Sequence, residues 1–126
     1  MTIETEQGSF DPTFDTLDAW VTLHFLPMYM RTLGGEFRWC RAWSEHAEAT
    51  SRLWTLWEAW ELASHDTGSG AMVSWYHELD HHLPILLGAR GPFYQCSEKE
   101  HIEPRVARSD PVTEEHWRIA FRREDR

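Results

Sequence analysis

Residues 37–63 read FRWCRAWSEHAEATSRLWTLWEAWELA and predict one long helix at the centre of the fold. The stretch contains neither proline nor glycine, and it is rich in Ala, Leu, Glu and Arg, which favour helices. One helix face recurs in steps of three and four, and it is apolar except at His46 and Thr50: Trp39, Trp43, His46, Thr50, Leu53, Trp57 and Trp60. A neighbouring stripe of Ala42, Ala49, Leu56 and Ala63 widens this face beyond half the circumference, as is typical of a helix surrounded by other helices.

Two further helices are expected, one on each side of this central helix in the sequence. The first starts after a cap at Asp15 or Thr16. It ends either at Leu26 or, if it continues with a kink at Pro27, at Arg31. A Gly34-Gly35 turn follows it. The third starts near Ala71 and ends at Gly88, and Pro84 either kinks it or starts a new turn. His82 lies on the same side as its core-facing residues, which are Met72, Trp75, Tyr76, Leu79, Leu83 and Leu86.

The expected fold is therefore an all-α, small compact three-helix domain with a Trp-rich central helix, plus a short C-terminal helix. Thr113 caps that last helix, and its narrow apolar stripe consists of Trp117, Ala120 and Phe121. No strand is expected. Residues 1–12 are predicted to form a disordered acidic tail, residues 13–101 the helical domain, and residues 102–126 a charged linker with the short helix.

The charge balance limits the classes of partner. At 126 residues the chain has the length of one domain, and its formal net charge is −9. Its first thirty residues contain five acids and no lysine or arginine. Such a chain does not attract nucleic-acid phosphates electrostatically, so we expect a protein partner, especially a basic one, or a small molecule. With two cysteines, no signal peptide and no apolar run long enough for a membrane span, we expect a reduced cytoplasmic protein.

Two Cys–His pairs form the first candidate site. Cys40 and His46 have the spacing C-x5-H, and Cys96 and His101 have the spacing C-x4-H. Two thiolates and two imidazoles suit a closed, structural zinc site, which would hold the loop around Gly91-Pro92-Phe93 against the central helix. On a continuous helix Cys40 and His46 would point about 120° apart, so both reach one ion only if Cys40 lies in an irregular first turn.

Other assignments of these residues stay open. His82 can take the place of His46 or His101 as a ligand. Alternatively, Cys40 and Cys96 are ordinary buried thiols and His101 is solvated.

The motif His77-Glu78-Leu79-Asp80-His81 matches H-E-x-x-H, the pattern of zinc-protease helices. Because Leu79 and its neighbours face the core, His77 and His81 fall on the polar side of the expected helix. We expect this side to be solvated, and we keep a zinc-dependent hydrolase as the alternative.

Glu61 and the tryptophans raise two further questions. Glu61 falls within the apolar arc, so it requires a partner; the candidates are Arg31, His24 and His82, and a functional acid in a pocket is the alternative. Most of the tryptophans are expected in the core, with one or two exposed as a protein contact.

Taken in order, the residues resemble a known family. The pattern comprises Trp39-Cys40, His46 with Glu48-Ala49, Leu56-Trp57-Glu58-Ala59-Trp60-Glu61, and Gly91-Pro92-Phe93 with Cys96. It resembles the uncharacterised family called domain of unknown function four-nine-one-three, over about residues 14–101. The resemblance implies small cytoplasmic proteins of actinobacteria, their plasmids and their phages. The family pattern includes the positions of Cys40, His46, His82, Cys96 and His101, which favours the metal hypothesis.

We therefore expect a non-enzymatic accessory protein of a phage or mobile element, acting by protein–protein interaction in the host cytoplasm, with a structural zinc bound by Cys40, His46, Cys96 and His101. The alternatives are the hydrolase that uses His77, Glu78 and His81, and an acidic decoy of a nucleic-acid-binding protein. The decoy would use the acids of the first eighteen residues.

Overall fold

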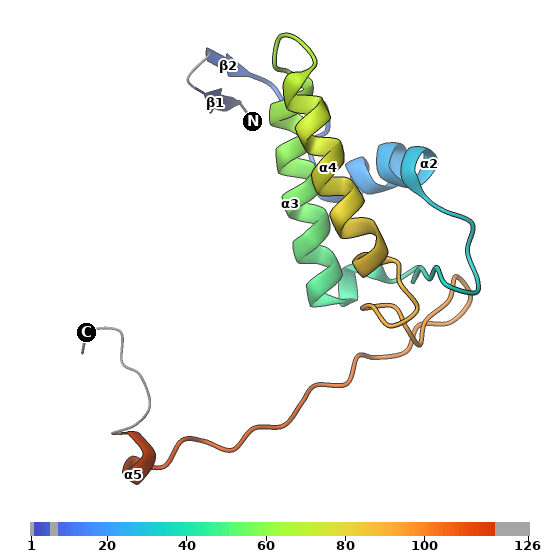
Figure 1. Cartoon of the computed structure of the whole chain (residues 1–126), viewed down its shortest axis with the longest axis vertical. Helices are drawn as coiled ribbons and strands as arrows, with labels where there is room; N and C mark the ends of the chain where they lie inside the picture. Colours follow the sequence, from blue (N-terminus) through green and yellow to red (C-terminus); the bar gives the residue numbers. More distant parts are fainter. Residues whose placement is uncertain (1, 6–7, 118–126) are drawn as a thin grey trace.

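The computed structural model describes residues 2–5 and 8–117, and Figure 1 shows their arrangement. The elements are β1 (Ile3–Thr5), β2 (Gly8–Phe10), α1 (Leu17–Trp20), the π-helical turn η1 (Val21–Phe25), α2 (Leu26–Tyr29), the 3-10 turn η2 (Trp43–Glu45), α3 (Ala47–Ser64), α4 (Gly70–Leu86) and α5 (Glu114–Trp117). The predicted helical fold class is confirmed for these residues.

The first predicted helix is a single helical unit made of α1, η1 and α2. Thr16 caps it, because its hydroxyl oxygen accepts a hydrogen bond from the Ala19 N–H at 3.1 Å. The unit passes through Pro27 and ends at Tyr29, where the backbone of Met30 becomes extended. Tyr29 lies within the predicted range of endpoints.

Helices α3 and α4 form an antiparallel pair that builds the core (Figure 1). The indole N–H of Trp75 on α4 donates to the Leu56 carbonyl oxygen on α3 at 2.9 Å, inside the interface. Fully buried side chains from all three helical units and the following loop belong to one hydrophobic core, among them Trp20, Phe25, Leu53, Leu56, Leu86 and Phe93. Within the described residues, no helix combines the length and the apolar character that crossing a bilayer requires.

Helix α3 begins ten residues later than the sequence predicts. The prediction of helix from Phe37 was wrong, because residues 37–42 are irregular and η2 follows them. The Arg38 N–H donates to the Leu87 carbonyl oxygen at 2.7 Å, and Phe37 bridges to Gly34 and Gly88. These hydrogen bonds to the end of α4 replace the helical ones, so tertiary pairing overrides the local helix propensity.

A β-hairpin occupies the N-terminal segment, where no strand was expected. β1 and β2 pair antiparallel with Ile3 opposite Phe10. The ring of Phe10 stacks on His65 at the end of α3, with centroids 4.1 Å apart and planes at 15°. The expectation of no strand was therefore wrong, whereas the division of the chain at residues 12 and 101 stays a prediction.

The chain after the helical body is extended and exposed from Glu103 to Thr113, and it leads to α5 (Figure 1). Helix α5 starts directly after Thr113, at the predicted position. The structure describes this helix only to Trp117, so Ala120 and Phe121 of the predicted stripe lie outside the described residues.

Glu61 is a buried carboxylate that ties the N-terminal segment to α3. It is 1% exposed, and it accepts hydrogen bonds from the Thr13 N–H at 2.8 Å, the Phe14 N–H at 3.0 Å and the Trp57 indole N–H at 3.0 Å. His65 lies 3.6 Å away. Three donors satisfy the buried charge, so no arginine is required.

Among the described residues, none of the three partners predicted for Glu61 forms a hydrogen bond with it, although His24 lies close enough for an electrostatic interaction with this carboxylate. Arg31 donates to the Tyr29 carbonyl oxygen, His24 contacts the Tyr29 hydroxyl, and His82 contacts Arg52.

Glu61→Gln is expected to lower the free energy of unfolding by about 2–4 kcal/mol. An amide offers one acceptor oxygen in place of two, so at least one buried N–H loses its partner. Urea denaturation followed by circular dichroism measures the change, and Glu58→Gln on the exposed side of α3 serves as the control. Equal unfolding midpoints for the two variants would contradict this role of Glu61.

Candidate metal centre

The segment before α3 places the first predicted Cys–His pair. The backbone pairing of Arg38 with Leu87 brings Cys40 into the interior, where it is fully buried. The turn η2 then reverses the chain, and His46 enters α3 in an extended conformation with φ −106° and ψ 110°. The irregular turn that joint ligation by Cys40 and His46 requires is therefore present.

The loop after α4 is shaped by two glycines. A Cβ atom at Gly88 would collide with the Pro84 carbonyl oxygen, and one at Gly91 would collide with the Ile85 carbonyl oxygen. Only glycine permits this close return of the loop onto the end of the helix. The return buries Phe93 completely against Trp39, with ring centroids 5.1 Å apart.

A compact turn links the second predicted pair. The Ser97 hydroxyl oxygen accepts hydrogen bonds from the N–H groups of Lys99 and Glu100, each at 3.1 Å. The Ser97 N–H in turn donates to the Glu100 carbonyl oxygen at 2.9 Å. This turn brings His101 back beside Cys96, with the His101 Nδ1 3.8 Å from the Cys96 Sγ.

The structure brings all four predicted residues together. The His101 Nδ1 lies 3.1 Å from the Cys40 Sγ and 3.8 Å from the Cys96 Sγ, and the Cys96 Sγ lies 3.5 Å from the His46 Nε2. One donor atom from each residue lies within 4.8 Å of the other three. Cys40, His46 and Cys96 are buried, and His101 is half-buried. This group can hold a metal ion.

The cluster has the size of a tetrahedral zinc site. Zinc–sulfur bonds of about 2.3 Å and zinc–nitrogen bonds of about 2.0–2.1 Å place neighbouring ligand atoms about 3.3–3.8 Å apart. The three contacts above, at 3.1, 3.5 and 3.8 Å, lie at or close to this range. Two sulfurs with two imidazole nitrogens favour zinc over the hard cations, which prefer oxygen ligands.

The protonation state of His46 suits a metal, whereas Cys40 would have to lose a proton on binding one. Burial, followed by the neighbouring His101, lowers the pKa of His46, so His46 is the neutral imidazole that binds metals. Burial raises the pKa of the Cys40 thiol to about 11. A metal that takes up Cys40 as a thiolate therefore displaces a proton, and binding releases protons.

Two glutamates that the sequence analysis did not single out hold the outer side of His101. Its Nε2 lies 3.1 Å from Glu103 and 3.7 Å from Glu45, while its Nδ1 faces the cysteines. A carboxylate at the far nitrogen fixes which nitrogen carries the proton and makes the other a better ligand. The sequence offers only a weak signal for them: Glu103 lies two residues after His101, whereas Glu45 adjoins His46 and meets His101 only in the folded chain.

The backbone also supports Cys96. The Ile102 N–H donates to the Cys96 Sγ at 3.3 Å, and the same sulfur lies 3.5 Å from the Ile102 carbonyl oxygen, so the backbone of Ile102 holds this side chain in place.

The other proposed metal residues lie elsewhere. His77, Glu78 and His81 are exposed on α4, and among the described residues they join no group of potential ligands. His82 accepts from the Arg52 guanidinium at 2.9 Å, and Arg52 also pairs with Glu48, so His82 does not join the four-residue group.

Replacing both outer glutamates, Glu45→Ala with Glu103→Ala, is expected to weaken zinc binding about 10–100-fold because His101 loses its orientation. Competition with a chromophoric chelator measures the affinity. The matched control is Glu98→Ala with Glu100→Ala, which removes the same charge from exposed positions in the neighbouring turn. An equal loss of affinity in both pairs would show an effect of net charge and contradict the orienting role.

Comparisons with known proteins place this chain in a family. The sequence model of the family described as Domain of unknown function (DUF4913) matches residues 14–116. The match contains all four residues of the cluster, and it extends past residue 101, where the likeness was expected to end. The comparisons with curated proteins and with solved structures found no match. Since the match spans most of its length, this chain belongs to the DUF4913 family.

Proposed function

We propose that the protein is a zinc-stabilised helical module that acts by binding another protein and not by catalysis. The observation that carries this proposal is the buried group of two thiols and two imidazoles, contributed in pairs by the segment before α3 and the segment after α4. Zinc bound by Cys40, His46, Cys96 and His101 would join these two segments at one end of the α3–α4 pair.

A structural role for zinc is supported by the closure of the site. Four protein ligands complete a tetrahedral shell, whereas a catalytic zinc keeps one position for water or substrate. The ring of Phe93 covers His46 edge-on, with centroids 5.0 Å apart and planes at 90°. A cavity of about 660 Å³, lined in part by His46 and Cys96, adjoins the cluster. The support for a structural zinc is therefore the set of four protein ligands, which would leave no coordination position for a substrate.

A protein-binding role is supported by surface features. Trp54 on α3 is 47% exposed, whereas Trp20, Trp39, Trp57, Trp60 and Trp75 are buried. An exposed tryptophan is a typical anchor of protein interfaces. The net charge of −9 favours a basic partner. An accessory role in a phage or other mobile element, in the host cytoplasm, is part of the same proposal and rests on the family resemblance.

Protein purified without a histidine tag is expected to contain one zinc per chain by mass spectrometry of the metal. Cys40→Ser and Cys96→Ser should each lose the zinc. A ligand present at about a thousandfold above its Kd stabilises by about 4 kcal/mol, so the Tm should fall by roughly 15–30 °C in a domain of this size. A chelator should lower the Tm of the wild-type protein and leave both variants unchanged.

His77→Ala is the control that separates this proposal from the hydrolase. This exposed residue is expected to be dispensable for zinc content and Tm. Zinc retained in both cysteine variants but lost in His77→Ala would overturn the structural site and support a zinc-dependent hydrolase through His77, Glu78 and His81.

A further inference from the structure

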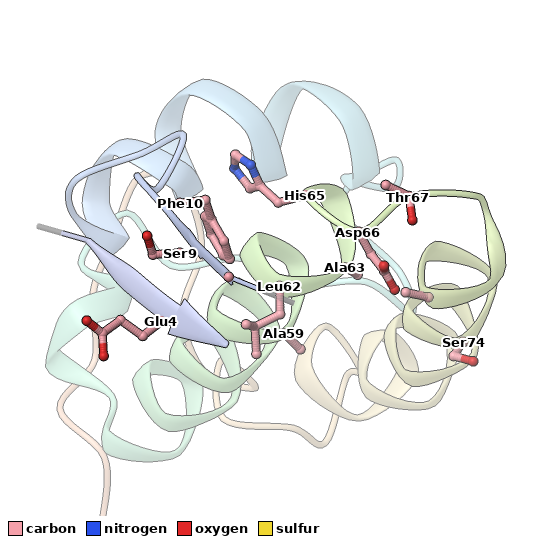
Figure 2. A pocket seen from close by; sticks show the side chains of 12 residues that line it. Glu4, Ser9, Phe10, Ala59, Leu62, Ala63, His65, Asp66, Thr67 and Ser74 are labelled. Carbon is pink, nitrogen blue, oxygen red and sulfur yellow. The ribbon is translucent and has the colours of Figure 1, made fainter. Parts of the chain in front are cut away.

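A cavity of about 800 Å³ lies at the end of α3 opposite the metal centre, between the β-hairpin and the start of α4 (Figure 2). Its volume falls within the range of about 300–1,000 Å³ that is usual for ligand sites. The hairpin, the end of α3, the following turn and the first turns of α4 all contribute residues to it.

The floor of the cavity is apolar. Leu62 and Ala59 from α3 form it, and Leu62 is 47% exposed although it is a large apolar side chain. Phe10 from the hairpin adds a flat aromatic wall, held in place by its stacking on His65. Figure 2 shows Leu62 between Phe10 on the hairpin side and Asp66 in the turn after α3.

The rim of the cavity is acidic. Glu4 on the hairpin and Asp66 in the turn after α3 line it together with the hydroxyl groups of Ser9, Thr67 and Ser74. The lining contains no lysine or arginine. Within the described part of the chain, neither the Glu4 carboxylate nor the Asp66 carboxylate has an ion pair.

We propose that this cavity receives an arginine side chain from a basic segment of the protein partner. This inference rests on the protein-binding role proposed above and names the chemistry of the partner. The aliphatic part of arginine would cover Leu62 and Ala59, and its guanidinium would stack on Phe10. Glu4 and Asp66 lie on opposite sides of the cavity (Figure 2), so one of them would pair with this guanidinium and the other with a neighbouring basic group of the same segment.

An arginine side chain fits this lining better than a lysine side chain. Its planar guanidinium stacks on aromatic rings and bonds a carboxylate with two N–H groups, whereas lysine is a strongly hydrated point charge. The surrounding charge also favours a basic segment, because the first thirty residues contain five acids and no lysine or arginine. Such a field raises the rate at which a cationic partner arrives.

The test is fluorescence anisotropy with labelled hexa-arginine and hexa-lysine peptides, titrated with the full-length zinc-loaded protein at physiological salt. Glu4→Gln with Asp66→Asn is expected to weaken hexa-arginine binding roughly threefold or more, as the loss of two exposed ion pairs predicts. The matched control, Asp80→Asn with Glu98→Gln, changes the same charge at exposed positions outside the cavity and is expected to leave binding unchanged.

Phe10→Ala separates stacking from charge. It is expected to reduce the preference for hexa-arginine over hexa-lysine without a change in net charge. Equal weakening by the two charge pairs, or an unchanged arginine preference in Phe10→Ala, would overturn the proposal. Failure of the zinc-loaded wild-type protein to bind hexa-arginine would also overturn the proposal. That result would not count against the metal centre, because the zinc content is measured separately.

Discussion

The meeting of two thiols and two imidazoles in the interior is the constraint on which the arrangement of the chain depends. Cys40 and His46 come before α3, and Cys96 and His101 come after α4, so their contact closes the open end of the helical pair. Polar groups at such a depth require partners, because their burial is otherwise costly. The Nε2 of His46 faces the cluster, because it lies 3.5 Å from the Cys96 Sγ. Its Nδ1 is an exception, since it is buried with no hydrogen-bond partner among the described residues.

The other end of α3 depends on a different interaction. Glu61 accepts the N–H groups of Thr13 and Phe14, which positions the start of the first helical unit and the hairpin before it. With 18 residues, α3 separates the two ends by about 27 Å. One end thus holds the proposed metal centre, and the other holds the cavity proposed for a basic partner. Binding at the cavity therefore need not disturb the metal ligands.

The helical fold and the four clustered residues could be predicted from the sequence because both leave local signals. Apolar spacing marked α4 and most of α3, and the paired Cys–His spacings marked the four residues that meet in the cluster. The start of α3 could not be predicted, because residues 37–42 have helical composition but bond to Leu87 at the end of α4. Only the folded chain brings that carbonyl oxygen into reach.

For the same reason, the partners of Glu61 and of His101 could not be predicted from the sequence. The sequence showed that a carboxylate on the apolar arc needed partners, but two of its three donors are backbone N–H groups nearly fifty residues away in the sequence. Every residue type except proline has such an N–H group, so the sequence does not mark these donors. The roles of Glu45 and Glu103 depend on the turn at Ser97, which sets the direction of the His101 ring. The hairpin was missed because its strands are only three residues long.

The most direct test of the account is X-ray absorption spectroscopy at the zinc edge on protein purified without a tag. If the four clustered residues bind zinc, we expect a four-coordinate ion with two sulfur ligands at about 2.3 Å and two nitrogen ligands at about 2.0–2.1 Å. Replacement of Cys96 by serine should abolish this signal. A first shell of nitrogen and oxygen alone, or protein that carries no zinc after purification in zinc-containing buffer, would contradict the central claim.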